Sequence, residues 1–218
     1  MLRHAPEMQF VRLGVTGANA FRQIAPISLL LTGLMTLMTL NLAHSGRGDR
    51  LIDDFSSADG RSRLGTSWRL VTDRVMGGVS NAGMSFREVD GRRALCMQGD
   101  VSLANNGGFV QINIDLSPDG YLDASEYQGV RLLVRGNGET YNLHLKTAAT
   151  SMPWQSYRAD FLADGQWREV RLPFADFEPH RLVPRLDLTR LSRLGVVAIG
   201  RPMRADLCVA EIGFYRPA

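Results

Sequence analysis

Apolar and polar residues alternate in short segments through most of the chain, and turn-forming residues separate one segment from the next. The segment Tyr141–Lys146 shows this best: three apolar side chains fall on one face of an extended strand, and Asn142, His144 and Lys146 fall on the other. A period of two is typical of antiparallel β-sheets that bury one side and leave the other in water. The pattern predicts short strands, with Asn142 and His144 on a polar sheet surface.

Roughly ten strands are predicted, spaced ~8–12 residues apart, which is typical of an all-β sandwich or jelly roll of two antiparallel sheets. The predicted strands are Leu51–Phe55, Trp68–Thr72, Met84–Val89, Ala94–Met97, Phe109–Leu116, Val130–Val134, Tyr141–Lys146, Tyr157–Leu162, Trp167–Leu172, Gly195–Ile199 and Leu207–Tyr215. Asp90-Gly91 and Asp164-Gly165 are turn signals, and each is expected to join its flanking strands as a hairpin. The alternation is lost in Phe174–Leu194. Within it, Asp187 is expected to cap one helical turn that ends at Leu194.

The distribution of charged residues along the chain excludes nucleic acid as an expected partner. The 218 residues contain 44% hydrophobic and 22% charged residues, as ordinary globular domains do. The formal net charge of +3 comes largely from the first 46 residues, where Arg3, Arg12 and Arg22 stand against one acid, Glu7. The remainder has almost no net charge and interspersed signs. It lacks the basic footprint of a nucleic-acid-binding protein, so no nucleic acid is expected as a partner.

An uncharged, strongly apolar segment, Gln23–Gly46, follows Arg22. A basic residue before an apolar run is typical of a secretory signal, and Ala43-His44-Ser45 offers a small-x-small cleavage site. Left uncut, the run is long enough to cross a bilayer as an anchor. A buried helix is the alternative interpretation.

The domain organisation follows from this segment. Residues 1–48 are predicted to be a signal peptide or membrane anchor, and residues 49–218 a single β-sandwich domain. The body is expected outside the cytoplasm, either periplasmic or anchored at the inner membrane, with a cytoplasmic location as the alternative. Membrane contact is expected only through the N-terminal segment.

The two cysteines, Cys96 and Cys208, lie in apolar strand-like runs, and their spacing does not suggest zinc. In an exported body they can form a disulfide, whereas in a cytosolic one they are expected to be buried small hydrophobic residues. Both alternatives stay open.

Two glycine-rich stretches, Thr72–Ser80 and Asn105–Phe109, share a composition. In the first, Gly77-Gly78 follows Met76, and in the second a glycine pair precedes a phenylalanine. Glycine reaches positive φ and lets another backbone or a ligand come close. The stretches are either tight turns or bulges between strands, or loops that meet at one end of the sandwich and shape a surface.

Six motifs carry a family resemblance when they are taken together in order. They are Thr72–Ser80, Asn106–Phe109, Gly129–Gly138, Trp154–Phe161, Trp167–Phe177 and Leu194–Ile199. With these, the body resembles the complex I intermediate-associated protein 30 (CIA30) family from about Ile52 to Tyr215. It departs from the family pattern at His180–Leu188, which lacks an Arg-Gly-Arg-type loop, and at the short, arginine-rich Gly200–Leu207.

The resemblance implies a galactose-binding-domain-like jelly roll, similar to some carbohydrate-binding modules, with a non-catalytic role. Mitochondrial members of the family are similar in acting as assembly chaperones of respiratory complex I. The family-motif loops would then be formed by Asp73, Met76, Gly77, Gly78, Asn106, Gly107, Gly108 and Phe109.

Aromatic faces beside polar groups suit a sugar ring or a peptide partner alike. The candidates for such a surface are Trp154, Tyr157, Arg158, Arg131, Asn142 and His144. Packing in the core is the alternative for Trp154 and Tyr157, and His144 is expected to be solvated. No catalytic residue, metal site or cofactor is predicted, although a structural calcium ion at Asp53-Asp54 and Asp73 stays open.

The sequence thus predicts a non-catalytic binding domain rather than an enzyme. Its leading interpretation is an assembly factor for a membrane complex of the respiratory complex I type, with protein subunits as partners. The alternative is a carbohydrate-binding module of the cell envelope, with a glycan as ligand.

Overall fold

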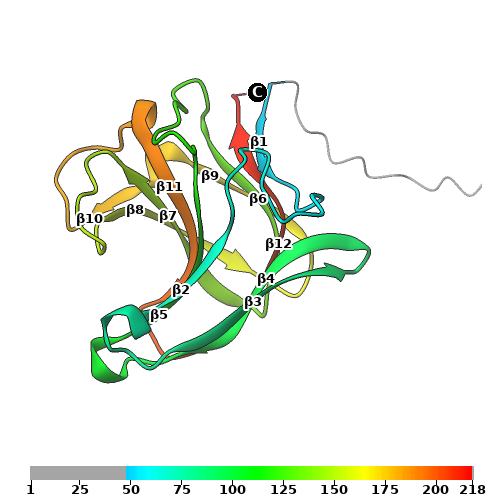
Figure 1. Ribbon diagram of the computed structural model, residues 1–218, viewed down its shortest axis with the longest axis vertical. Helices are drawn as coiled ribbons and strands as arrows, with labels where there is room; N and C mark the ends of the chain where they lie inside the picture. The colour runs from blue at the N-terminus through cyan, green and yellow to red at the C-terminus, as the bar shows by residue number, and fades with distance from the viewer. Residues whose placement is uncertain (1–47, 218) are drawn as a thin grey trace, which may run out of the picture. The chain divides into compact units, whose positions relative to one another are not determined.

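The computed structural model describes residues 48–217, and the predicted leader segment and Ala218 lie outside the described residues. Within residues 48–217 the chain forms twelve strands and four 3₁₀ turns (Figure 1). The strands are β1 (Arg50–Asp53), β2 (Arg69–Thr72), β3 (Asn81–Val89), β4 (Arg92–Val101), β5 (Phe109–Asp115), β6 (Gly129–Arg135), β7 (Glu139–Thr147), β8 (Ser156–Ala163), β9 (Arg168–Pro173), β10 (Glu178–His180), β11 (Leu191–Ile199) and β12 (Met203–Tyr215). The 3₁₀ turns are η1 (Asp73–Met76), η2 (Ala104–Asn106), η3 (Phe174–Asp176) and η4 (Leu188–Arg190). No helix in this part of the chain is long and apolar enough to span a membrane.

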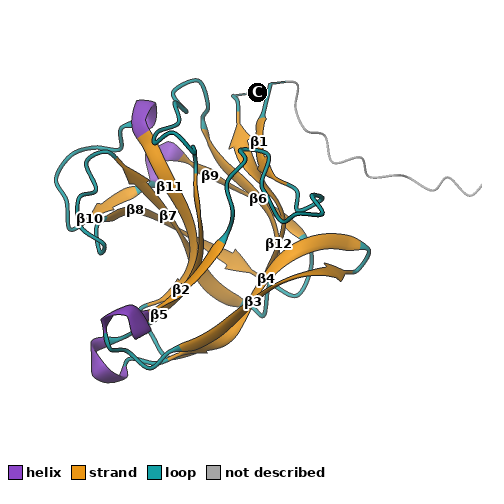
Figure 2. Ribbon diagram, viewed as in Figure 1, coloured by secondary structure: helices purple, strands orange, loops and turns teal. Residues whose placement is uncertain are grey.

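The strands form two six-stranded antiparallel sheets (Figure 2). Sheet I has the order β3-β4-β12-β6-β9, with β1 paired to β12. Sheet II has the order β10-β8-β7-β11-β5-β2. The predicted all-β sandwich of two antiparallel sheets is confirmed.

The apolar core lies between the sheets. Tyr141, Leu143 and Leu145 of β7 are fully buried, as the alternating pattern predicts, and they share one apolar cluster with Val209 and Phe214 of β12. Each fully buried side chain of this size contributes about 2 kcal/mol through removal of apolar surface from water. Because the inward positions of β7 are apolar, its polar residues are placed on the outer face of sheet II.

The predicted hairpin at Asp164-Gly165 is wrong. The strand before it, β8, belongs to sheet II, and the strand after it, β9, pairs with β6 in sheet I. The backbone N–H of Gly136 donates to the carbonyl of Asp164 at 2.6 Å, and that of Gly138 donates to Ala163 at 2.8 Å. Two turns therefore brace each other where the chain crosses between the sheets. An Asp-Gly pair reverses the chain in either setting, so local sequence does not separate a hairpin from a crossing.

The helical turn expected from Asp187 is much shorter than predicted. Asp187 does accept a hydrogen bond from the N–H of Thr189 at 3.0 Å, but η4 ends at Arg190 and β11 begins at Leu191. β11 is an interior strand of sheet II between β5 and β7, and pairing on both edges extends it. The short edge strand β10 was not predicted.

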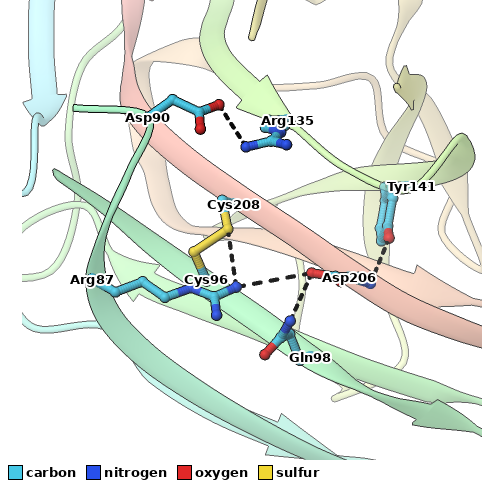
Figure 3. The surroundings of a disulfide bond; sticks show 8 residues. All are labelled: Arg87, Asp90, Cys96, Gln98, Arg135, Tyr141, Asp206 and Cys208. Atoms are coloured by element: carbon cyan, nitrogen blue, oxygen red, sulfur yellow. Dashed lines mark hydrogen bonds and ion pairs between the residues drawn. A yellow bond between two sulfur atoms is a disulfide. The ribbon is translucent and has the colours of Figure 1, made fainter. Parts of the chain in front are cut away.

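Cys96 and Cys208 form a disulfide (Figure 3). The two residues are register partners on β4 and β12, and they pack with Ala94 and Ala210 in a small apolar cluster apart from the main core. Arg87 lies beside the bond and donates to the Cys208 Sγ at 3.5 Å. The sequence left open whether the two cysteines form a disulfide or remain as buried free thiols, and the structure shows the disulfide.

Candidate functional site

The two glycine-rich loops meet at Asp73. Its side chain is completely buried, and its carboxylate accepts hydrogen bonds from the Ser80 N–H at 2.9 Å, the Ser80 hydroxyl at 2.5 Å and the Gly108 N–H at 2.6 Å. The Phe109 N–H donates to it at 3.3 Å. Burial alone would raise the pKa of Asp73, but these donors outweigh it and hold the pKa below its usual range. The interpretation of loops meeting at one end of the sandwich is confirmed.

Two glycines make room for this carboxylate. A Cβ at Gly78 or at Gly107 would overlap the Asp73 carboxyl group. Gly77 has a φ of 90°, the left-handed region, and its N–H closes η1 on the Arg74 carbonyl. The glycine pairs are therefore required by the buried acid and by the turn beside it.

The paired loops present apolar side chains to solvent. Val75 is 75% exposed and Met76 is 60% exposed, and Val79 and Leu103 are also exposed. We call these four residues the apolar tip. It belongs to the end of the sandwich that carries η1 and η2 (Figure 2).

A second feature is the outer face of sheet II, where register aligns side chains across four strands. Arg158 on β8 pairs with His144 on β7, His144 with Gly195 on β11, and Gly195 with Asn113 on β5. Gly195, between His144 and Asn113 in the row, has no side chain. The Gln111 Oε1 atom lies 3.4 Å from where a Gly195 Cβ would be. The neighbouring row is formed in the same way by Asp160, Asn142, Val197 and Gln111.

A hollow of about 380 Å³ opens on this face along β8 and β10. It is lined by Asn142, Arg158, Ala159, Asp160, Asp176, Glu178, Pro179 and His180. Asn142 and Arg158, two of the residues predicted from the sequence, therefore share one surface depression, and His144 lies beside Arg158 in the register.

His144 is on the outer face as predicted, but the expectation that it is solvated is wrong. It is largely buried, and its Nε2 atom has no hydrogen-bond partner within the described chain. Burial lowers its pKa to about 3, and the positive charges of Arg158, His180 and Lys146 act in the same direction. His144 is therefore neutral at physiological pH.

Asn113 is not among the candidate residues that the sequence indicates. It lies on the outer face yet is only 3% exposed, and its Oδ1 atom has no partner among residues 48–217. A buried polar atom without a partner is uncommon and costs about 1–3 kcal/mol. The available signal was the polar position inside the apolar Phe109–Leu116 run, but sequence alone does not show that Gly195 will sit beside it.

Trp154 is 48% exposed, so the core alternative does not apply to it. Its loop is fixed on both sides. Lys146 donates from Nζ to the carbonyls of Met152 at 3.3 Å and Pro153 at 2.8 Å, and the Gln155 side chain donates to the carbonyl of Arg181 at 3.0 Å. These bonds hold the Trp154 loop at the end of sheet II where Lys146 and Arg181 lie.

Two predicted candidates do not belong to this surface. Tyr157 is fully buried in the core, and its hydroxyl donates to the carbonyls of Pro184 at 2.9 Å and Arg185 at 3.1 Å. Arg131 lies on β6 in sheet I, is buried, and forms ion pairs with Asp49 and Glu211. Alternation along one strand does not tell which sheet the strand joins, so Arg131 was grouped with the wrong face.

The carboxylates considered for calcium are used within the protein. Asp53 accepts from the Trp68 indole N–H at 2.8 Å and from the Phe55 N–H at 2.8 Å. Asp54 is paired with Arg63 at 2.8 Å, and Asp73 binds the loop donors described above. Residues 48–217 contain no cluster of three or more His, Cys, Asp or Glu side chains placed to hold a metal ion.

Residues 48–217 thus form a jelly-roll sandwich with a polar outer face on sheet II and two loops that meet at one end. The CIA30 family model, described as "Complex I intermediate-associated protein 30", matches residues 54–208. The chain belongs to this family. No curated protein sequence matches the chain.

Solved structures share the fold at low sequence identity. The family 11 carbohydrate-binding module of the cellulosomal cellulase Lic26A-Cel5E of Clostridium thermocellum has a TM-score of 0.61 at 14% identity, covering 78% of this chain and 95% of the module. The same module type in complex with a β-1,3-1,4-mixed-linked tetrasaccharide has a TM-score of 0.59 at 13% identity, covering 77% and 95%. An agarase, AgWH50C, has a TM-score of 0.51 at 11% identity, covering 78% of this chain and 26% of the agarase.

Proposed function

We propose that this domain is a non-catalytic glycan-binding domain of the cell envelope and that its ligand lies along the outer face of sheet II. The observation that carries the proposal is the pair of buried polar atoms on that face, His144 Nε2 and Asn113 Oδ1, which have no partner within residues 48–217. A sugar hydroxyl both donates and accepts hydrogen bonds, so a bound glycan can satisfy either atom once the side chains above them move aside.

Other features of the same face support the proposal. The hollow beside Arg158 and Asn142 gives room for a ring, and exposed Trp154 offers an aromatic face near one end. The fold is that of modules whose description includes a bound tetrasaccharide. The Cys96–Cys208 disulfide supports a location in an oxidising compartment, where an envelope glycan is accessible.

Glycan binding is tested by affinity electrophoresis of the full chain on a panel of soluble polysaccharides. We expect Trp154→Ala and Asn142→Ala to weaken retention of the bound glycan by about tenfold or more. Tyr121→Ala is the matched control, because Tyr121 is also 48% exposed but belongs to a loop elsewhere. Equal losses in the Trp154 and Tyr121 variants, or no retention on any glycan, would contradict the proposal.

A second candidate function is assistance in assembly of a respiratory membrane complex, with a protein subunit as partner. Two observations favour it: the description of the family, and the apolar tip that Asp73 holds together. Exposed apolar side chains on a braced loop are typical of protein contact sites. Co-purification with respiratory subunits tests it. Loss of a partner from the double variant Val75→Ser and Met76→Ser, but not from Val183→Ser, would support this function, since Val183 is an exposed apolar residue of a different loop.

A further inference from the structure

We infer that the end of sheet II next to the Trp154 loop binds an anionic group, the carboxylate or sulfate of an acidic glycan, with Arg158 as its principal ligand. This inference rests on the proposed glycan binding by the same face. It adds the chemical class of the ligand and the place where its charge is held.

The orientation of Arg158 is the first step. Its Nε donates to the Ser156 hydroxyl at 3.0 Å, which directs the side chain toward the β8 end that carries Ser156. The remaining guanidinium nitrogens have no hydrogen-bond or ion-pair partner in the described residues, although the side chain is partly buried. Two free N–H groups on a planar guanidinium match the two oxygens of a carboxylate or sulfate.

Several basic side chains lie around Arg158, and none of the nearby acids that the structure describes forms an ion pair with it. Lys146, the only lysine of the chain, bonds to two neutral carbonyls, and Arg181 and His180 lie next to β8 on the β10 side. Within residues 48–217, no carboxylate lies within 4.0 Å of the charged groups of Arg158, Lys146 or Arg181. We call Arg158, Lys146, Arg181 and His180 the cationic cluster.

The pKa shifts agree with this geometry. The pKa of Arg158 is lowered by burial and then by Arg181, with Asp160 opposing. The pKa of Lys146 is lowered by burial and then by Arg193 and Arg158, and that of His180 by burial and then by Arg158 and Arg181. Arg181 thus disfavours the charged form of Arg158, and Arg158 disfavours the charged forms of Lys146 and His180. An anion bound beside Arg158 would oppose these effects.

The nearby acids do not fill this role. Asp115 is already shared by Arg69 at 2.6 Å and Arg193 at 2.7 Å. Asp160, Asp176 and Glu178 line the hollow together with Arg158, but none forms an ion pair with its guanidinium within 4.0 Å, and the Arg158 Nε donates to Ser156 instead. None of these acids is therefore an ion-pair partner of Arg158.

Trp154 completes the arrangement. Its loop is tied to two members of the cationic cluster, through the Lys146 ammonium and the Arg181 carbonyl. An acidic sugar can stack its ring on the indole while its charged substituent reaches Arg158. A neutral sugar would satisfy the hydrogen bonds but leave the charges of Arg158, Lys146 and Arg181 uncompensated.

The test compares three soluble probes against the full chain: polygalacturonate, which carries carboxylates, dextran sulfate, which carries sulfates, and a neutral mixed-linked β-glucan. The variant is Arg158→Gln combined with Arg181→Gln. The control is Arg93→Gln, which removes a charge from an exposed position of sheet I. We expect the double variant to weaken binding of the preferred acidic polymer by roughly tenfold or more, and Arg93→Gln to change it by less than about twofold.

The position at which the acidic polymer binds is tested separately, by the protection of Lys146 from chemical modification. Because it is the only lysine, amine acetylation followed by peptide mass spectrometry reports on the cationic cluster directly. We expect the bound acidic polymer to protect Lys146 in the wild-type chain, and protection should weaken between about 0.05 and 0.5 M NaCl. Because it uses the wild-type chain, Lys146 protection tests the anionic site even if the double variant does not fold.

The outcomes separate this inference from the proposed function. Binding of the neutral β-glucan as tightly as the acidic polymers, unchanged in the double variant, overturns the anionic site and leaves glycan binding intact. Equal weakening by Arg93→Gln, or an unprotected Lys146, shows attraction by overall charge and overturns the site. Absence of binding to all three probes overturns both. Preference between polygalacturonate and dextran sulfate identifies which anion the site takes.

Discussion

The Asp73 carboxylate accepts a hydrogen bond from the Gly108 N–H at 2.6 Å, across 35 residues of sequence. This bond joins the two glycine-rich loops of the chain into one structure. A carboxylate that receives four donors in a dry site is worth far more to the fold than an exposed one, because the donors would otherwise be buried without partners.

Asp73→Asn should destabilise the domain by about 2–3 kcal/mol, because an amide accepts through one oxygen only and turns an N–H₂ toward backbone donors. Chemical denaturation monitored by tryptophan fluorescence measures the loss. Asp59→Asn is the control, because Asp59 is exposed and its bonds are local. A loss below about 0.5 kcal/mol for Asp73→Asn would show that the buried bonds do not stabilise the loops.

Gly78→Ala should cost about 2 kcal/mol or more, because the added methyl group would overlap the buried Asp73 carboxyl group and force the loop to move. Gly83→Ala is the matched control for Gly78→Ala. Gly83 lies on β3, and a Cβ there meets no atom within 4 Å, so its effect should stay within about 0.5 kcal/mol. The melting temperatures of the two variants are compared by thermal unfolding. Similar values would contradict the claim that Gly78 is required by the Asp73 carboxyl group.

His144 should make the domain sensitive to mild acid. Its pKa is about 3 in the folded protein and near 6.5 when the chain is unfolded, so below pH 6.5 the unfolded state binds the proton more readily. The stability contributed by neutral His144 is therefore complete above pH 6.5 and is lost as the pH falls toward 3. Between pH 7 and about 5 the loss should be roughly 2 kcal/mol.

Denaturant titrations of the wild-type chain and of His144→Gln at several pH values measure this effect. The Gln variant lacks the titrating group, so its stability should fall less over the same range. His180→Gln is the control, since its imidazole is less buried and its pKa is lowered less. Parallel pH curves for the wild type and His144→Gln would show that His144 is not held neutral.

Reduction of the Cys96–Cys208 bond should lower the free energy of unfolding by about 2–5 kcal/mol, because the bond closes a loop across 112 residues of the unfolded chain. The same loss is expected for the double variant Cys96→Ala and Cys208→Ala. Unfolding curves with and without a thiol reductant give the measurement, and the double variant should not respond to the reductant. An unchanged midpoint on reduction would mean that the bond adds nothing to stability.

Much of the fold could be predicted from the sequence because strand alternation is a local property. Tyr141, Leu143 and Leu145 turned inward, and Asn142 and His144 outward, as their spacing requires. One failure was an assignment between sheets. The Asp164-Gly165 turn was placed in a hairpin, although its two strands belong to different sheets.

The site was predicted less completely. Asn142, Arg158 and Trp154 do gather near one face, whereas Tyr157 packs in the core and Arg131 belongs to the other sheet. Asn113 and Gly195 were missed because their importance arises only when β5, β11 and β7 lie side by side in register.

The sequence by itself determined most of the strands, the inward and outward faces of strands such as β7, and the family, since periodicity and motif order are written along one chain. Tertiary structure alone decided which strands share a sheet, that Cys96 meets Cys208, and that His144 is buried among cations. Those features depend on contacts between residues far apart in the chain, where the burial and charge around a side chain come from segments that its neighbours in sequence do not specify.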